Sequence, residues 1–140
     1  MPVVVEAGKT VKATIDVVNA GQQKGTFRLQ GQIFYASTTN LAGNFFVTQG
    51  YSSTNPPPSG ANIKQFELGP GAPGQVIMYS GVWADGRPTA FPSAQLFDVL
   101  WTLTCVETGQ SVTRTDRNAL QHQTLTPPQA QITNVTYTVI

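Results

Sequence analysis

Few side chains in this 140-residue chain could take part in acid–base, nucleophilic or metal chemistry: one His, one Cys and seven carboxylates spread along the sequence. Catalysis needs such groups to converge. A Cys–His pair would have to unite Cys105, predicted to point inward from an apolar strand, with His122 in a polar segment. One His and one Cys also fall short of the three or four ligands of a zinc site. We therefore predict a protein that is not an enzyme and uses no metal or cofactor.

Two other kinds of ligand site lack their sequence patterns. Calcium loops are dense in Asp and Asn, and no such loop occurs here. The glycines within residues 69–74 precede a strand pattern, whereas a phosphate-binding loop leads into a helix. Residues 69–74 are therefore predicted to form a turn.

The overall charge argues against some partners and for others. Charged residues make up 11% of the chain and the net charge is +1, whereas soluble domains average roughly 25% charged residues. The cations are scattered, so we expect no nucleic-acid partner. No apolar run approaches the ~20 residues that span a bilayer, so we expect no membrane partner. A nearly neutral surface gives little repulsion between molecules, which favours protein partners and homo-oligomers.

The elements that must carry these residues are strands, because apolar and polar residues alternate over residues 11–18, 26–35 and 97–106. We expect the first two runs to be adjacent antiparallel strands. The third is expected to bury Trp101 and Cys105 and to form a hairpin with residues 110–116. No helical stripe of useful length exists, although residues 117–123 could hold one helical turn. The fold class predicted is all-β, an antiparallel Ig-like or jelly-roll-like sandwich of about seven to nine strands.

A long loop, residues 48–62, interrupts the strand pattern. Its Pro56-Pro57-Pro58 run removes backbone donors and stiffens the centre of the loop. Tyr51 is its one large side chain. Trp83 ends a strand near the Asp85–Pro88 turn and Phe91, so we expect Tyr51, Trp83 and Phe91 to form a surface patch that binds a protein or a carbohydrate.

A β-prone run, residues 131–140, follows the Pro127-Pro128 link. We divide the chain into a sandwich domain, residues 1–123, and a C-terminal strand or arm, residues 124–140. Two alternatives stay open for the arm. It completes the same sandwich, or it adds to the open edge of a neighbouring subunit.

Two resemblances add expectations about fold and role. The Asn19-Ala20-Gly21 turn and the Leu68-Gly69-Pro70-Gly71 turn resemble those of bacterial cell-adhesion-related Ig-like domains, over about residues 3–116. That likeness implies a fold, and no binding residue is carried over from it. The whole profile of a small, weakly charged, all-β chain with a β-prone arm resembles phage capsid decoration proteins.

The first functional hypothesis is a non-enzymatic structural protein of a virion that stabilises a capsid shell through contacts with its protein subunits. The alternatives are an Ig-like adhesion module of a secreted or cell-surface protein and a carbohydrate-binding sandwich. The chain starts at Met1 without a signal-peptide pattern, so we expect use without Sec export, unless a leader was removed. The residues predicted to bind partners are Tyr51, Pro57, Trp83, Phe91, Ile132, Val135, Tyr137 and Val139.

Overall fold

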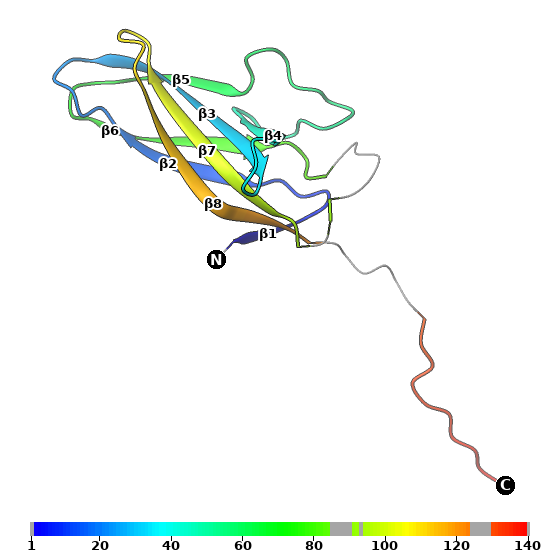
Figure 1. Ribbon diagram of the computed structural model, residues 1–140. Coiled ribbons are helices and arrows are strands. Elements are labelled where there is room, and N and C mark those ends of the chain that lie inside the picture. Colours follow the sequence, from blue (N-terminus) through cyan, green and yellow to red (C-terminus); the bar gives the residue numbers. More distant parts are fainter. Residues whose placement is uncertain (1, 85–90, 93, 124–129, 140) are drawn as a thin grey trace.

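The computed structural model describes residues 2–84, 91, 92, 94–123 and 130–139. These residues form eight strands and no helix, which confirms the all-β class (Figure 1). The strands are β1 (Val3–Glu6), β2 (Lys12–Val18), β3 (Gly25–Tyr35), β4 (Leu41–Phe46), β5 (Ile63–Leu68), β6 (Pro73–Ser80), β7 (Leu96–Cys105) and β8 (Ser111–Gln123).

The strands form one curled sheet in the order β1-β8-β7-β3-β4-β6-β2, with β5 paired to the first half of β3. β4 turns the sheet over, because Asn44 pairs with β3 while Phe45 and Phe46 pair with β6. The half that contains β8, β7 and β3 therefore faces the half that contains β6 and β2, as in a sandwich. All pairings are antiparallel except that of β1 with β8, which is parallel.

The prediction that residues 11–18 and 26–35 form neighbouring strands is wrong. β2 pairs with β6, and β3 pairs with β7, β4 and β5. Alternation identifies the buried face of a strand but carries no information about which strand lies at its edge. The two runs lie in opposite halves of the sheet and share the core between them.

The alternating faces themselves are as expected. Ala13, Ile15 and Val17 of β2 pack against the core, while Lys12, Thr14 and Asp16 are exposed. Trp101 is buried as predicted, and its ring centroid lies 4.9 Å from that of Phe45. The buried hydrophobic cluster is made of Val5, Leu29, Ile33, Phe45, Val76, Met78, Trp83, Phe91, Phe97, Val99, Trp101 and Leu120.

The second half of β8 departs from the prediction of a helical turn and a polar tail. Residues 117–123 continue the strand, and Leu120 and His122 are buried. The physical reason is β1, which pairs in parallel with residues 120–123 and closes this end of the core. Cys105, expected to be buried, is only half-buried because it ends β7.

Residues 130–139, which we call the arm, form no strand and extend away from the domain (Figure 1). Its Tyr137 is 90% exposed and its Val139 fully so. Both alternatives for the arm, completion of the same sandwich and exchange with a neighbour, stay predictions. The Pro127-Pro128 link and the Asp85–Pro88 turn lie outside the described residues.

Candidate functional site

The loop of residues 48–62 brings together two of the predicted binding residues. Tyr51 and Pro57 line a hollow of about 170 Å³ with Phe46 and Val82. The Tyr51 ring lies edge-on to the Phe46 ring, with 5.2 Å between the ring centroids. The backbone carbonyl of Tyr51 accepts a hydrogen bond of 2.9 Å from the Val82 amide. Tyr51 is therefore held in place at the surface, and Pro57 is exposed beside it, so both remain available to a partner.

Trp83 and Phe91 do not join Tyr51 in a surface patch, which corrects the prediction. Trp83 is only 5% exposed, and its ring centroid lies 5.4 Å from Phe91 and 5.0 Å from Phe97. Its indole Nε1 donates a 2.9 Å hydrogen bond to Nδ1 of buried His122. No local pattern predicts this bond, because the two residues are far apart in the chain and meet only in the core.

The imidazole of His122 has a structural role. Burial lowers its pKa, and the Trp83 bond uses Nδ1 as an acceptor, so the neutral form fits this site. Cys105 lies at the other end of the β7–β8 hairpin, next to the turn that pairs Thr104 with Ser111, whereas Gln121 pairs with Leu96. The structure therefore does not bring the Cys and the His together.

Asp98 is the one buried carboxylate among the described residues. It lies in β7 where the register with β8 shifts between Phe97 and Val99. It accepts hydrogen bonds from the amides of Asn118 at 2.8 Å and Ser37 at 2.9 Å, and from Arg117 Nη1 at 3.1 Å. Burial alone would raise its pKa, but these donors outweigh burial and lower it. All of its partners are structural, and the described residues hold no cluster of three or more metal-ligating side chains.

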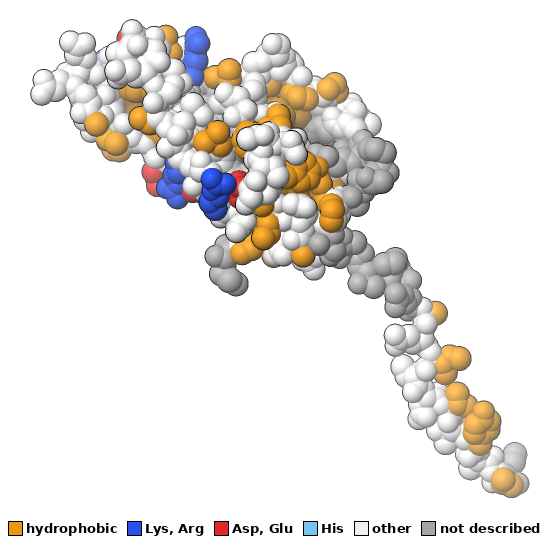
Figure 2. Space-filling view, viewed as in Figure 1, with side chains coloured by type: hydrophobic (Ala, Val, Ile, Leu, Met, Phe, Trp, Pro, Cys, Tyr) orange, Lys and Arg blue, Asp and Glu red, His pale blue; other side chains and the backbone are white. Residues whose placement is uncertain are grey.

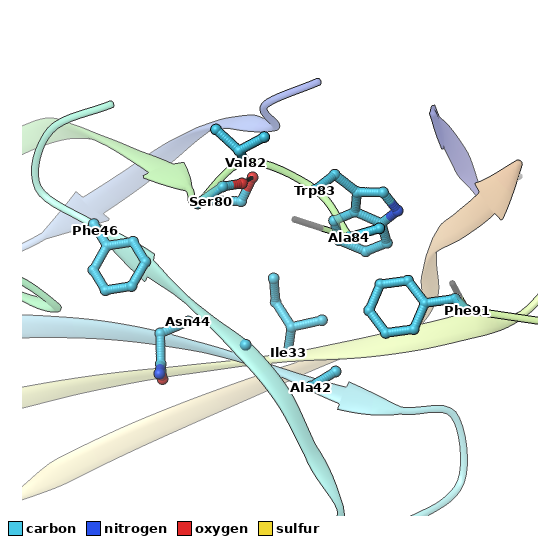
Figure 3. A pocket seen from close by; sticks show the side chains of 11 residues that line it. Ile33, Ala42, Asn44, Phe46, Ser80, Val82, Trp83, Ala84 and Phe91 are labelled. Carbon is cyan, nitrogen blue, oxygen red and sulfur yellow. Dashed lines mark hydrogen bonds between the residues drawn. The ribbon is translucent and has the colours of Figure 1, made fainter. Parts of the chain in front are cut away.

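A pocket of about 220 Å³ opens where β4 crosses between the two halves of the sheet (Figure 3). Ile33, Phe46, Trp83 and Phe91 point toward it from different elements, and Asn44 and Ser80 are its polar side chains. The Ser80 hydroxyl already bonds the Val11 amide and the Gly81 carbonyl. With no titratable side chain in its lining, this pocket offers shape and apolar contact but no acid or base.

The arm presents the remaining predicted residues, Ile132, Val135, Tyr137 and Val139, all of them exposed (Figure 2). Sequence reasoning missed a second surface feature, a groove of about 330 Å³ between β2 and β8. Those strands are distant in the chain and lie near opposite ends of the strand order, and they line one groove only because the sheet curls. No local sequence signal could have located this groove.

Comparisons with known proteins assign no family. No protein-family model matches the chain, and no curated protein matches it. Among solved structures, the chain is similar to a family 123 glycoside hydrolase from Clostridium perfringens, with 8% identity and a TM-score of 0.49. The match covers 89% of this chain and 23% of that enzyme, a likeness that supports no assignment of activity. The described residues contain no helix that could cross a membrane.

Proposed function

We propose that this protein is a non-enzymatic structural subunit that fastens neighbouring proteins of a larger assembly, most specifically a decoration or cement protein of a virion capsid. The observation that carries the proposal is the arm. It exposes Ile132, Val135, Tyr137 and Val139 to solvent while the rest of the described chain forms a packed domain. Exposure of these apolar side chains to water is unfavourable in free energy, and binding to a partner removes that exposure.

The arm has the properties of a strand that adds to another sheet. Val135, Tyr137 and Val139 alternate with Thr136 and Thr138, so residues 135–139 have one apolar face when extended. Ile132 lies on the opposite face, with Thr136 and Thr138. Each such side chain gains about 1.5–3 kcal/mol when fully buried. Ordering the backbone opposes this by about 1–2 kcal/mol per residue, so the arm needs both an apolar surface and a free sheet edge to bind tightly.

The domain supplies a second, smaller contact. The hydrogen bond from Val82 fixes the backbone of Tyr51, and the ring of Pro57 restricts its own φ angle, so both residues lose little freedom when a partner covers them. Together the arm and this loop suit a protein that bridges two neighbours. The same geometry is compatible with the alternative of an adhesion module. The carbohydrate alternative loses Trp83 and Phe91, which are buried, and depends on Tyr51 alone.

The proposal is tested by asking whether the protein belongs to particles. Lysates of the source cells are separated on density gradients, and the protein is detected with antibodies raised against the full chain. We expect it in fractions that hold nuclease-resistant nucleic acid and regular particles. Recovery only from the free soluble fraction or from the surface of intact cells would overturn the virion assignment.

The role of the arm is tested with two matched variants of the full chain. Tyr137→Asp puts a charge on the apolar face of the arm, and Thr136→Asp puts the same charge on the opposite face. Purified particles stripped of the protein should rebind the Thr136 variant and fail to retain the Tyr137 variant. Equal rebinding of both would show that the arm does not make the contact.

A further inference from the structure

The groove lies between β2, which is an edge strand of the curled sheet, and the part of β8 that β1 leaves uncovered. Residues 14–17 of β2 form one wall and residues 112–116 of β8 contribute most of the other. Leu29, Trp101 and Leu103 form its floor. The groove is therefore open to solvent above an apolar base that continues the core.

β2 has a free hydrogen-bonding edge along this groove. The Val11 carbonyl accepts from the Ser80 amide at 2.9 Å, and the Asn19 amide donates to Ala72 at 3.0 Å. Backbone groups alternate in direction along a strand, so odd-numbered residues of β2 face β6. The N–H and C=O groups of Thr14 and Asp16 therefore point away from β6, and no described strand pairs with that edge.

β8 has a matching free edge. The Cys105 amide donates to the Gln110 carbonyl at 2.8 Å, so even-numbered residues in this half of β8 face β7. The backbone groups of Thr113 and Thr115 point outward. β1 covers the edge of β8 only at residues 120–123.

The inner face of β8 is left uncovered beside this edge. Val112 pairs with Leu103 and Arg114 pairs with Trp101, so the side chains of both β8 residues lie on the side of the sheet that faces the core. Yet Val112 is 66% exposed, because the opposite half of the sheet ends at β2. One more strand beside β2 would cover Val112 and satisfy the free edge.

We infer that the β2–β8 groove is the acceptor for the arm of a second copy of this chain, which inserts as an additional strand. This inference rests on the proposed function, in which the arm fastens a neighbouring protein, and it names the neighbour and its binding site. Val135, Tyr137 and Val139 face Trp101, Leu103 and Val112, while Thr136 and Thr138 face solvent.

The fit is one of length, polarity and charge. Residues 135–139 of the arm span five positions, and the β8 residues that line the groove, Val112, Thr113, Arg114 and Asp116, span the same number. The described arm carries no charged residue. The charged side chains that line the groove already have partners in the same chain, because Arg114 Nε bonds Asp116 Oδ1 at 2.8 Å and Asp16 Oδ1 accepts a hydrogen bond from Gln75 Nε2 at 3.3 Å. The arm of the same chain lies outside its own groove (Figure 1), which leaves the groove open to the arm of another molecule.

The contact is head to tail, because one molecule gives its arm and the other gives its groove. Self-association of the full chain is measured by sedimentation velocity over a range of concentrations. We expect Val112→Asp in the groove and Tyr137→Asp in the arm each to weaken association at least about tenfold, since each would bury an unpaired carboxylate. Thr115→Asp and Thr136→Asp, on the faces turned away from the contact, should associate like the parent chain.

Mixing gives the sharpest result. The Val112 variant keeps an intact arm and the Tyr137 variant keeps an intact groove, so an equimolar mixture should form dimers that grow no further. Both positions are exposed in the single chain, and unchanged circular dichroism and thermal midpoints verify that the variants fold.

Three results would overturn the inference: a parent chain that stays monomeric at every concentration, a Val112 variant that associates normally, or a mixture that behaves as the sum of its parts. A monomer whose arm amides resist hydrogen exchange would show that the arm folds into its own groove instead. If the parent is monomeric but the Tyr137 variant still fails to rebind particles, the groove assignment fails while the proposed function stands.

Discussion

Gly31 is the position at which one added carbon should disturb both the core and the groove. It lies in β3 directly opposite Trp101 of β7. A Cβ at residue 31 would lie 2.8 Å from Cε3 and from Cη2 of the Trp101 ring. Real Cβ atoms essentially never lie this close to another heavy atom. Trp101 is also packed against Phe45, so its ring has little room to retreat within the core.

The magnitude of Gly31→Ala follows from two opposing effects. Overpacking of a filled core costs about 1–3 kcal/mol. Replacement of glycine also reduces the conformational entropy of the unfolded chain, which stabilises the folded protein by about 0.4–1 kcal/mol. At the midpoints of these ranges, the free energy of unfolding should therefore fall by about 1.3 kcal/mol. Gly43→Ala is the matched control, because a Cβ at that β4 position meets nothing within 4 Å and should leave stability equal or slightly higher.

Urea denaturation followed by circular dichroism and tryptophan fluorescence measures both variants. Trp101→Phe provides a further check, since a smaller ring should reduce the cost of Gly31→Ala and give a positive coupling in a double-mutant cycle. Equal stability of the Gly31 and Gly43 variants would refute the claim that the missing Cβ at Gly31 is what makes room for the indole.

The remaining predictions concern buried polar groups. Asp98→Asn should lower the free energy of unfolding by about 2–4 kcal/mol, because three donors lose a charged acceptor. Asp116→Asn, which breaks an exposed ion pair with Arg114, should change it by less than about 1 kcal/mol in the same urea titration. Burial lowers the pKa of His122, so stability should be level above about pH 6.5 and fall as the pH drops below it, where the unfolded chain takes up the proton more readily. Because the chain has a single His, His122→Asn should flatten this slope between about pH 7 and about pH 5.5, and an unchanged slope would refute the assignment.

The alternation of residue types determined the local structure of this protein. It located β2, β3 and the β7–β8 hairpin and placed Ile15, Leu29 and Trp101 inside, because a strand has only two faces and burial chooses the apolar one. It also singled out the arm, whose apolar residues alternate like those of a strand although the structure leaves them exposed.

Strand order was decided by the tertiary structure alone, because backbone hydrogen bonds at a strand edge are the same for every sequence. Because of that order, Trp83 donates a hydrogen bond to His122 and lies in the core, where the sequence predicted a surface patch. The same order leaves the edge of β2 and part of the edge of β8 unpaired on either side of an apolar groove. The sequence by itself determined that the apolar residues of the arm alternate as in a strand with one buried face. Only the folded sheet, by ending at β2 while the inner face of β8 is still uncovered, provided a place for such a strand to bind.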